Sequence, residues 1–254
     1  MKKLYISLPI LFLLFSCNDD SQLGDDLIQE KDNTLVEQPI QGQKLKKMED
    51  KSGIHHYFYN SAGFIDSIYH TDREFSSFAT SKFHYNNHNK VTSIVEIDGE
   101  GTIETPINQV ERKYIFSYNS KNQIIKEEIF NGGNILIKTN DFNYTNDGYL
   151  QSDNLYFNNG NLITERDPYP YEDGFTSYTY TYNNKLNPFY IIYPDAYKKI
   201  RLINKNDVVS KLITDEINGN FKVDYELEYN TYDFKSYQLE KYNGVNFSTT
   251  YTYY

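Results

Sequence analysis

The residues best suited to metal chemistry in this chain are five histidines, all within one third of the sequence. They are His55, His56, His70, His84 and His88. Neutral imidazole is a ligand for zinc, copper and haem iron. His56 and His84 occupy neighbouring copies of a repeat, so they approach each other if they share one face. We consider these two as candidate ligands for a metal, haem or porphyrin, but no cysteine accompanies them, and our expectation is surface histidines and no cofactor.

Sequence motifs for catalysis are missing from the chain. It contains no Gly-x-Ser-x-Gly elbow, no phosphate-binding loop, no zincin helix motif and no dinucleotide fingerprint. The chain has 35 Asp and Glu residues, so a pair of carboxylates that cleaves a glycosidic bond stays an alternative. We predict a protein that is not an enzyme, with a polysaccharide-acting enzyme as the competing hypothesis.

Stacking on tyrosine rings is a second kind of binding chemistry that the composition favours. The chain has 26 Tyr and 16 Phe but no Trp. Most tyrosines follow a strand pattern, and we expect these rings to form the core, where cross-strand aromatic pairs contribute about 0.2–1 kcal/mol each. Four others lie in or near proline-containing loops, where binding residues concentrate. These candidate ligand-binding residues are Tyr169, Tyr171, Tyr193 and Tyr197.

The single cysteine, Cys17, follows a short apolar segment at the N-terminus. Two lysines precede this run of residues 4–15, which is typical of a secretory signal and too short to span a bilayer. The ending Leu14-Phe15-Ser16-Cys17 resembles the lipobox of bacterial lipoproteins. The resemblance implies that residues 1–16 are a signal peptide and that Cys17 is lipidated and anchors the chain to a membrane.

The residues after the cysteine are acidic. Asn18, Asp19 and Asp20 resemble the export signal that sends lipoproteins of Bacteroidota to the outer face of the outer membrane. Residues 18–42 contain seven acidic residues, one lysine and no aromatic residue, which indicates a flexible tether over residues 17–42. We therefore expect a lipid-anchored protein of the outer membrane, exposed at the cell surface.

Net charge narrows the possible partners. The chain carries −10, and removal of residues 1–16 with Lys2 and Lys3 leaves −12. Such a chain repels nucleic acid and anionic headgroups, so we expect no nucleic-acid partner and membrane attachment through the lipid alone. No cysteine follows Cys17, so disulfides are excluded and the core must supply the stability.

These side chains must be positioned by a repeat that fills residues 43–254. In each copy a tyrosine is followed by a polar turn and, six positions after the tyrosine, by an aliphatic residue. The clearest copies pair Tyr59 with Ile65, Tyr85 with Val91, Tyr118 with Ile124, and Tyr144 with Leu150. Side chains two positions apart share a sheet face, so the aromatic residue two positions before each tyrosine lies on the same side. Each copy therefore predicts one antiparallel hairpin.

Further turns are expected at the other end of the hairpins. Asn-Gly and Asp-Gly are the strongest short hairpin signals. The dipeptides expected to form these turns are Asp98-Gly99, Asn131-Gly132, Asn159-Gly160, Asn218-Gly219 and Asn243-Gly244. Residues 167–174 contain two prolines, which lack backbone donors, so this stretch is expected to be an exposed loop.

The repeat resembles a known family. The stretch Phe58-Tyr59-Asn60-Ser61-Ala62-Gly63-Phe64-Ile65 resembles the YD or RHS repeat, with asparagine in place of the usual aspartate. Residues 182–189 and 204–209 resemble Bacteroidota lipoproteins built from such repeats. The resemblance covers about residues 43–254 and implies a curved β-sheet wound into an open shell or barrel. It transfers no catalytic residues.

Together these observations predict an all-β fold: a long antiparallel meander of about 14–16 strands with almost no helix. A flat sheet of this size leaves one aromatic face wet and two edges open. We expect it to curl into an open barrel-like shell, with a β-sandwich or a propeller-like fold as alternatives. The predicted function is non-enzymatic binding or scaffolding, with a glycan, another envelope protein or a small apolar molecule as the partner.

Overall fold

The computed structural model of this protein describes residues 42–73, 77–102, 104–169 and 174–254. The expected signal peptide and the expected tether, apart from Gly42, lie outside these ranges. The strands are β1 (Leu45–Glu49), β2 (Gly53–Tyr59), β3 (Ile65–Asp72), β4 (Ser77–Tyr85), β5 (Val91–Gly101), β6 (Pro106–Tyr118), β7 (Ile124–Asn131), β8 (Leu136–Asp141), β9 (Leu155–Asn158), β10 (Asn161–Pro168), β11 (Phe175–Leu186), β12 (Asn206–Asp215), β13 (Gly219–Tyr229), β14 (Lys235–Tyr242) and β15 (Val245–Tyr253). Two short helices, α1 (Pro188–Ile192) and α2 (Asp195–Ile200), interrupt the strands.

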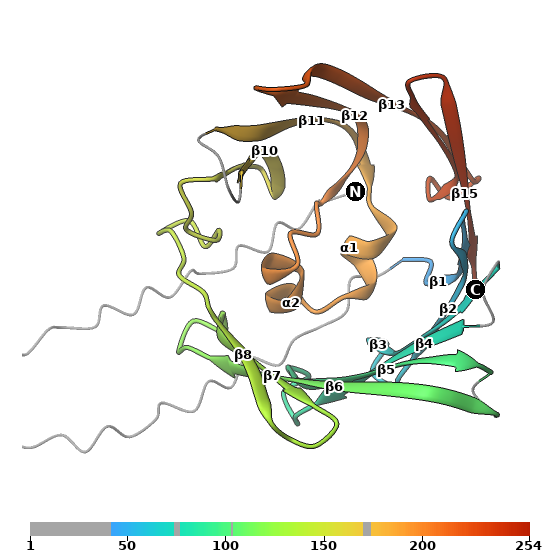
Figure 1. Cartoon of the computed structure of the whole chain (residues 1–254), viewed down its shortest axis with the longest axis vertical. Helices are drawn as coiled ribbons and strands as arrows, with labels where there is room; N and C mark the ends of the chain where they lie inside the picture. Colours follow the sequence, from blue (N-terminus) through green and yellow to red (C-terminus); the bar gives the residue numbers. More distant parts are fainter. Residues whose placement is uncertain (1–41, 74–76, 103, 170–173) are drawn as a thin grey trace, which may run out of the picture. The chain divides into compact units, whose positions relative to one another are not determined.

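Within the described ranges, all the strands belong to one antiparallel sheet of 15 strands, which confirms the predicted meander. The order is β8-β7-β6-β5-β4-β3-β2-β1-β15-β14-β13-β12-β11-β10-β9. The first and last strands of the chain pair with each other in the middle of the sheet, through Leu45 opposite Tyr253 and Met48 opposite Tyr251. The two edges are β8 and β9, which are consecutive in the chain but not hydrogen-bonded to each other. The sheet curls into an open barrel-like shell (Figure 1), and we call the place where β8 and β9 fail to pair the seam.

In most repeats an asparagine directly after the tyrosine organises the turn. The side-chain oxygen of Asn86 accepts hydrogen bonds from the backbone N–H groups of His88 and Lys90, both at 3.0 Å. Asn119 and Asn230 make the same bonds with the second and fourth residues that follow them. Such side-chain bonds to the local backbone are the reason asparagine favours turns.

In the repeats that keep this turn, the fourth residue after the tyrosine has a positive φ. Gly63 and Gly148 adopt φ values of 93° and 79°, which cost glycine little. Asn89 and Asn122 adopt 60° and 61° at the same position, because asparagine tolerates the left-handed region better than most residues. Asparagine therefore replaces the expected turn glycine without changing the turn.

The tyrosines of the repeat tie neighbouring hairpins together. The hydroxyl of Tyr85 donates to the backbone oxygen of Ile65 at 2.5 Å, and that of Tyr118 donates to the backbone oxygen of Val91 at 2.7 Å. The same bond links Tyr59 to Leu45, Tyr144 to Ile124, Tyr182 to Leu162 and Tyr253 to Lys235. Every acceptor is a buried residue in the first two positions of a strand. The spacing of six residues between the tyrosine and the aliphatic residue thus places two groups at the start of a strand. One is an apolar side chain for the core, and the other is a backbone carbonyl that accepts the hydroxyl of the next tyrosine.

One pair of repeats departs from this rule. Asp207 and Lys235 occupy the strand-start positions of β12 and β14, where other repeats have an aliphatic residue, and both are buried. Their side chains form an ion pair at 2.8 Å. Here Tyr229 donates its hydroxyl to the Asp207 carboxylate at 3.1 Å, in place of a backbone carbonyl. Burial raises the pKa of Asp207, and the facing ammonium and hydroxyl oppose that rise.

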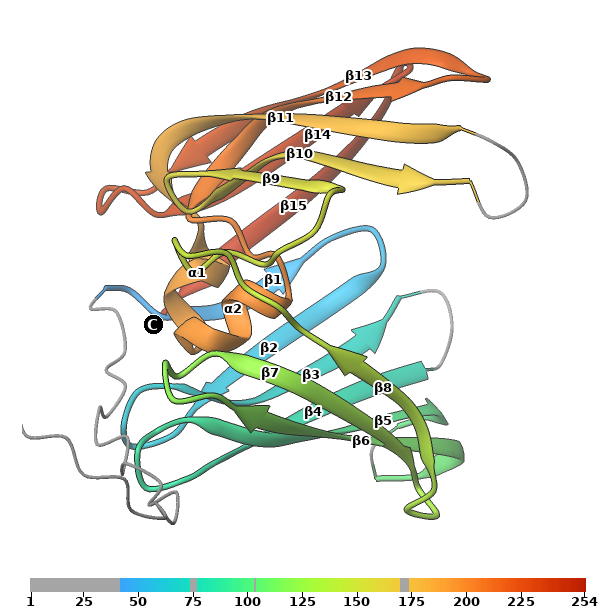
Figure 2. The same cartoon turned by 90° about the vertical axis from the view of Figure 1, so that its left-hand side faces the viewer.

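A helical insert, residues 187–205, replaces the repeat turn between β11 and β12. Asn187 caps α1 by accepting the backbone N–H of Phe189 at 3.0 Å, and Pro188 suits the first helical position because its φ is fixed. The insert folds into the curve of the sheet, where α1 contacts β1 and α2 contacts β7 (Figure 2).

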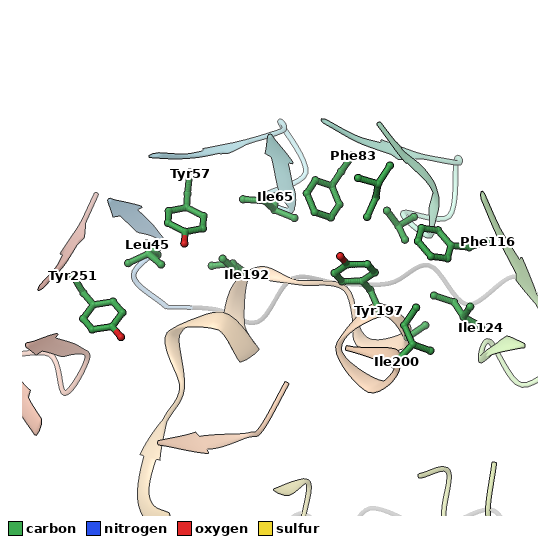
Figure 3. Close-up of a cluster of buried hydrophobic side chains, with 13 residues drawn as sticks. Leu45, Tyr57, Ile65, Phe83, Phe116, Ile124, Ile192, Tyr197, Ile200 and Tyr251 are labelled. Atoms are coloured by element: carbon green, nitrogen blue, oxygen red, sulfur yellow. The ribbon is translucent and has the colours of Figure 1, made fainter. Parts of the chain in front are cut away.

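The main core lies between this insert and the concave face of the sheet. Ile192, Tyr197 and Ile200 of the insert pack with buried side chains from β1 to β7 and β15 (Figure 3). The ring of Tyr197 meets Phe83 and Phe116 edge to face, at centroid distances of 5.7 and 6.0 Å. Such aromatic pairs contribute about 0.5–1.5 kcal/mol beyond their buried area. The shell is therefore filled on this side by its own chain.

One predicted turn is wrong. Asp98 and Gly99 lie inside β5, which continues to Gly101 before the chain reverses. Gly99 is needed there for a different reason: a Cβ atom on it would lie 2.8 Å from the ring of Phe78 on the neighbouring strand. The predicted loop at 167–174 is shorter than expected on its first side, because β10 extends to Pro168 at the start of the chain reversal.

Candidate functional site

The seam is the place where the regular hydrogen bonding of the shell stops. Residues 142–154 cross from β8 to β9, held by an isolated bridge between Tyr144 and Leu150. Tyr156 stands six residues before the buried Leu162, as in the other repeats, but its side chain is 62% exposed. The regular repeat packing is thus interrupted between the two edge strands.

A small cavity lies at the seam, between the crossing segment, β9 and the helical insert. Its volume is about 60 Å³, and it is partly open to solvent. The lining residues are Tyr149, Leu150, Phe157, Gly160, Tyr190, Asp195, Lys198, Lys199, Leu202, Ile203 and Asn204. Most of these groups are apolar or aromatic, and the charged ones all come from the insert.

The outer wall of the cavity is a stacked aromatic pair. The rings of Tyr149 and Phe157 lie 5.2 Å apart and are nearly parallel, at 4°. The Tyr149 hydroxyl accepts a hydrogen bond from the backbone N–H of Gly160 at 3.0 Å. Gly160 has a φ of 84°, so the β9–β10 turn presents its backbone here without a side chain. The stack therefore fastens the crossing segment to the β9–β10 hairpin.

The inner wall carries two lysines and one carboxylate. The ammonium of Lys198 lies 4.0 Å from the centre of the Tyr190 ring, and the residue is only 5% exposed. Lys198 and Lys199 both approach Asp195, each at 3.5 Å. One carboxylate thus faces two ammonium groups, and the lining has a net positive charge.

A polar anchor holds this wall against the shell. Arg201, just after α2, pairs with Glu127 of β7, which is 1% exposed. Asn140 of the edge strand β8 donates to the same carboxylate at 2.8 Å. Breaking a buried pair of this kind is costly because one charge is left uncompensated. The position of the lysines therefore depends on the contact between the insert and the β7–β8 edge.

The expected binding tyrosines do not meet at this cavity. Tyr169 follows β10 at the end opposite the cavity and accepts the Glu216 backbone N–H at 3.1 Å. Tyr193 lies beside Pro194 between α1 and α2, and Tyr197 lies within α2, so both belong to the helical insert. Tyr197 is 8% exposed, and burial raises the pKa of both phenols. Their neighbour Tyr190 is the tyrosine of the insert that reaches the cavity. Tyr171 lies outside the described residues, as do Cys17, Asn18, Asp19 and Asp20.

The two candidate histidine ligands are not brought together. His56 lies on β2 and His84 on β4, with β3 between them. The structure stacks a different pair, His55 and His70, with ring centroids 4.1 Å apart. Burial, and then the neighbouring His70, lower the pKa of His55. Within the described ranges, no group of three or more His, Cys, Asp or Glu side chains is arranged to hold a metal ion.

Comparisons with known proteins found a distant structural similarity but no matching family or curated sequence. No protein-family model matches it, and no curated protein sequence matches it. Among solved structures, it is similar to a porin-like protein from Bacteroides uniformis, with a TM-score of 0.41 and 13% identity over 83% of this chain and 96% of that chain. In the part of the chain that the structure describes, neither helix is long and apolar enough to cross a membrane.

The cavity is the feature that reading the sequence missed. Two signals for the insert were present: Asn187-Pro188, a typical helix start, and the loss of strand alternation in residues 188–200. The insert also carries four basic residues and one acidic residue, a net charge of +3 in a chain of −10. The composition of the whole chain conceals this basic segment.

Proposed function

We propose that this protein is a lipid-anchored lipoprotein of the bacterial outer membrane that binds a small ligand at the seam. The cavity at the seam carries this proposal, because it joins an apolar lining with a few convergent polar groups, as ligand sites do. The lipobox-like ending at Cys17 and the acidic residues behind it support the location. The proposed activity is binding without turnover.

The position of the cavity also supports binding. It lies beside the edge strand β9, which has no hydrogen-bonded partner strand on its outer side among the described residues, so a ligand can enter without breaking a β-ladder. The wall opposite this edge is the helical insert, which the core holds in place. A site with one rigid wall and one open side suits capture and release.

Ligand binding is tested by filling the cavity. The full chain is purified from envelopes, and ligand retained from the cells is measured by native mass spectrometry. Ile203→Trp adds bulk at the cavity lining, and Ile217→Trp, on a side chain that is 62% exposed, is the matched control. Retained ligand that is lost only in Ile203→Trp, with both variants folded, supports the proposal. Equal retention by the two variants contradicts it.

The anchor is tested separately with Cys17→Ala. The variant should lose membrane association and keep its thermal unfolding curve, because the cysteine precedes the repeat domain. Continued fractionation with membranes contradicts the lipid anchor. It leaves the cavity experiment unaffected.

A further inference from the structure

One residue that lines the seam cavity has a backbone conformation that its side chain disfavours. Leu202 follows α2 and has a φ of 52°. The other non-glycine residues with a positive φ, among those that the structure describes, are all asparagine or aspartate. Those two types tolerate the left-handed region, whereas a bulky apolar side chain is strained there. Strain of this kind persists where the side chain itself has a role.

The conformation of Leu202 is imposed by the way α2 ends. The backbone N–H of Ile203 donates to the carbonyl of Lys198 at 2.9 Å, and the N–H of Leu202 donates to the carbonyl of Lys199 at 3.3 Å. These two bonds form a Schellman motif, in which the residue at the position of Leu202 is left-handed and is usually glycine. The motif therefore fixes the backbone at this position but does not require leucine.

The side chain of Leu202 belongs to an apolar part of the cavity lining. Leu150, Phe157 and Ile203 line the same cavity. A glycine at position 202 would leave the backbone bare, and an asparagine would place an amide in the lining. Leucine adds hydrocarbon instead. Apolar cavities hold water poorly and take up apolar molecules.

Two polar side chains of the lining are already bonded to the backbone of the β9–β10 hairpin. The Tyr149 hydroxyl accepts the N–H of Gly160 at 3.0 Å, and the side-chain oxygen of Asn204 accepts the N–H of Leu162 at 2.7 Å. The lining thus offers few further groups to a ligand with many hydroxyls. Buried hydroxyls without partners are unfavourable, so the lining selects against a sugar.

The charged side chains of the lining also have partners within the chain. The ammonium of Lys198 lies 4.0 Å from the centre of the Tyr190 ring, and Lys198 and Lys199 each approach Asp195 at 3.5 Å. A charged ligand would compete with these contacts and would lose hydration on entering an apolar site. An uncharged ligand meets neither obstacle.

We propose that the seam cavity binds an uncharged apolar group, such as a hydrocarbon ring, and that Leu202 determines this specificity. The inference rests on the proposed function, because it concerns the same cavity. The ligand is held by burial of its hydrocarbon surface against Leu202 and the stacked pair of Tyr149 and Phe157. No covalent step is involved.

The first test compares three molecules that share a benzene ring and differ in charge: toluene, benzoate and benzylamine. Each is titrated into the full chain at neutral pH in sealed tubes, and binding is followed by ligand-observed NMR. Toluene should bind saturably, with a Kd at least about tenfold below the Kd of either charged molecule. Added salt should not weaken toluene binding, because no ion pair is formed.

The second test changes Leu202 itself. Leu202→Asn introduces the residue type that most other positive-φ positions of this chain carry, with a side chain of similar shape, so the variant should fold. The Kd for toluene should rise about tenfold, because an amide replaces hydrocarbon in the lining. Leu212→Asn makes the same change on a β12 side chain that is 42% exposed, and its Kd should equal that of the parent chain. Thermal unfolding verifies that both variants are folded.

Three outcomes overturn the inference. They are the lack of saturable toluene binding, a charged analogue that binds as tightly as toluene, and an unchanged toluene Kd in folded Leu202→Asn. None of these outcomes contradicts the proposed function, because cavity filling by Ile203→Trp can still abolish retention of a ligand of another class. Equal retention by Ile203→Trp and Ile217→Trp contradicts the proposed function itself, whatever the result with toluene.

Discussion

The two halves of the shell solve the same packing problem with different chemistry. In β1 to β7 each repeat buries an aliphatic residue at the start of a strand: Leu45, Ile65, Val91 and Ile124. In β12 to β15 the equivalent positions of β12 and β14 hold Asp207 and Lys235, joined as an ion pair. The backbone arrangement survives the change, since Tyr253 still donates to the carbonyl of Lys235 at 2.7 Å. The repeat therefore depends on its tyrosine and turn more than on the nature of the buried side chain.

The largest expected effect comes from breaking the ion pair. Lys235→Leu leaves the Asp207 carboxylate buried without its cation, and the free energy of unfolding should fall by about 3–5 kcal/mol. The measurement is urea unfolding followed by tyrosine fluorescence. A loss below about 1 kcal/mol contradicts the view that the pair is desolvated.

Replacing both charged residues with leucine should make this repeat like those of β1 to β7, which bury an aliphatic residue. The double variant Asp207→Leu/Lys235→Leu removes both buried charges, and its free energy of unfolding should match or exceed that of the parent, by up to about 4 kcal/mol. The same urea unfolding compares the free energy of unfolding of the double variant with that of Lys235→Leu, and the double variant should be the more stable of the two. If the double variant is as unstable as the sum of its single changes, the pair does not act as a unit.

Removal of tyrosine hydroxyls compares the two kinds of acceptor. Tyr229→Phe loses a bond to a carboxylate and should cost about 1.5–3 kcal/mol, whereas Tyr85→Phe loses a bond to a backbone carbonyl and should cost about 0.5–1.5 kcal/mol. Both values come from chemical denaturation of otherwise identical chains. The reverse order means that the Asp207 carboxylate is satisfied without Tyr229.

Acidic pH should destabilise the first half of the shell specifically. The pKa of His55 is lowered by burial and then by His70, so the unfolded chain takes up a proton there before the folded chain does. The stabilising effect of neutral His55 is complete above about pH 6.5 and is lost as the pH falls below that value. Hydrogen exchange at about pH 7.5 and about pH 5.5 should show the loss in β2 and β3.

His55→Phe is the control for this pH effect, because it keeps a stacked ring that does not titrate. The acid-dependent loss in β2 and β3 should shrink in this variant. It should persist in His84→Gln, which changes an exposed histidine. Equal loss in all three proteins assigns the pH effect to other groups.

The smallest expected effect concerns the turns. Asn89→Gly replaces a non-glycine residue at a φ of 60° by the residue that Gly63 and Gly148 supply in other repeats. The free energy of unfolding should change by less than about 1 kcal/mol in either direction, because relief of strain and greater freedom of the unfolded chain oppose each other. Thermal unfolding measures this difference. A loss of several kcal/mol shows that Asn89 has a role beyond its φ.

The sequence by itself determined the meander, most of the turns and the tyrosine rows. Alternation of side chains and the chemistry of Asn and Gly are local properties, so they can be read from residues a few positions apart. The tyrosine to aliphatic spacing of six, for example, carries both the turn at Asn86 and the strand start at Val91. The burial of Asp207 and Lys235 cannot be predicted from neighbouring residues in the sequence. Each charge is buried only because it pairs with the other, which lies on a different strand.

Only the tertiary structure decided where the sheet begins and ends. The first and last described strands, β1 and β15, pair with each other, which moves the open edges to β8 and β9, although these strands follow each other in the sequence. The insert also meets the seam through residues far apart in the chain: the backbone N–H of Leu162 donates to the side-chain oxygen of Asn204, 42 residues later, at 2.7 Å. The physical reason is that the pairing of β1 with β15 and the core packing of the insert are long-range contacts. No short-range pattern encodes them, and the candidate site exists only because both are formed.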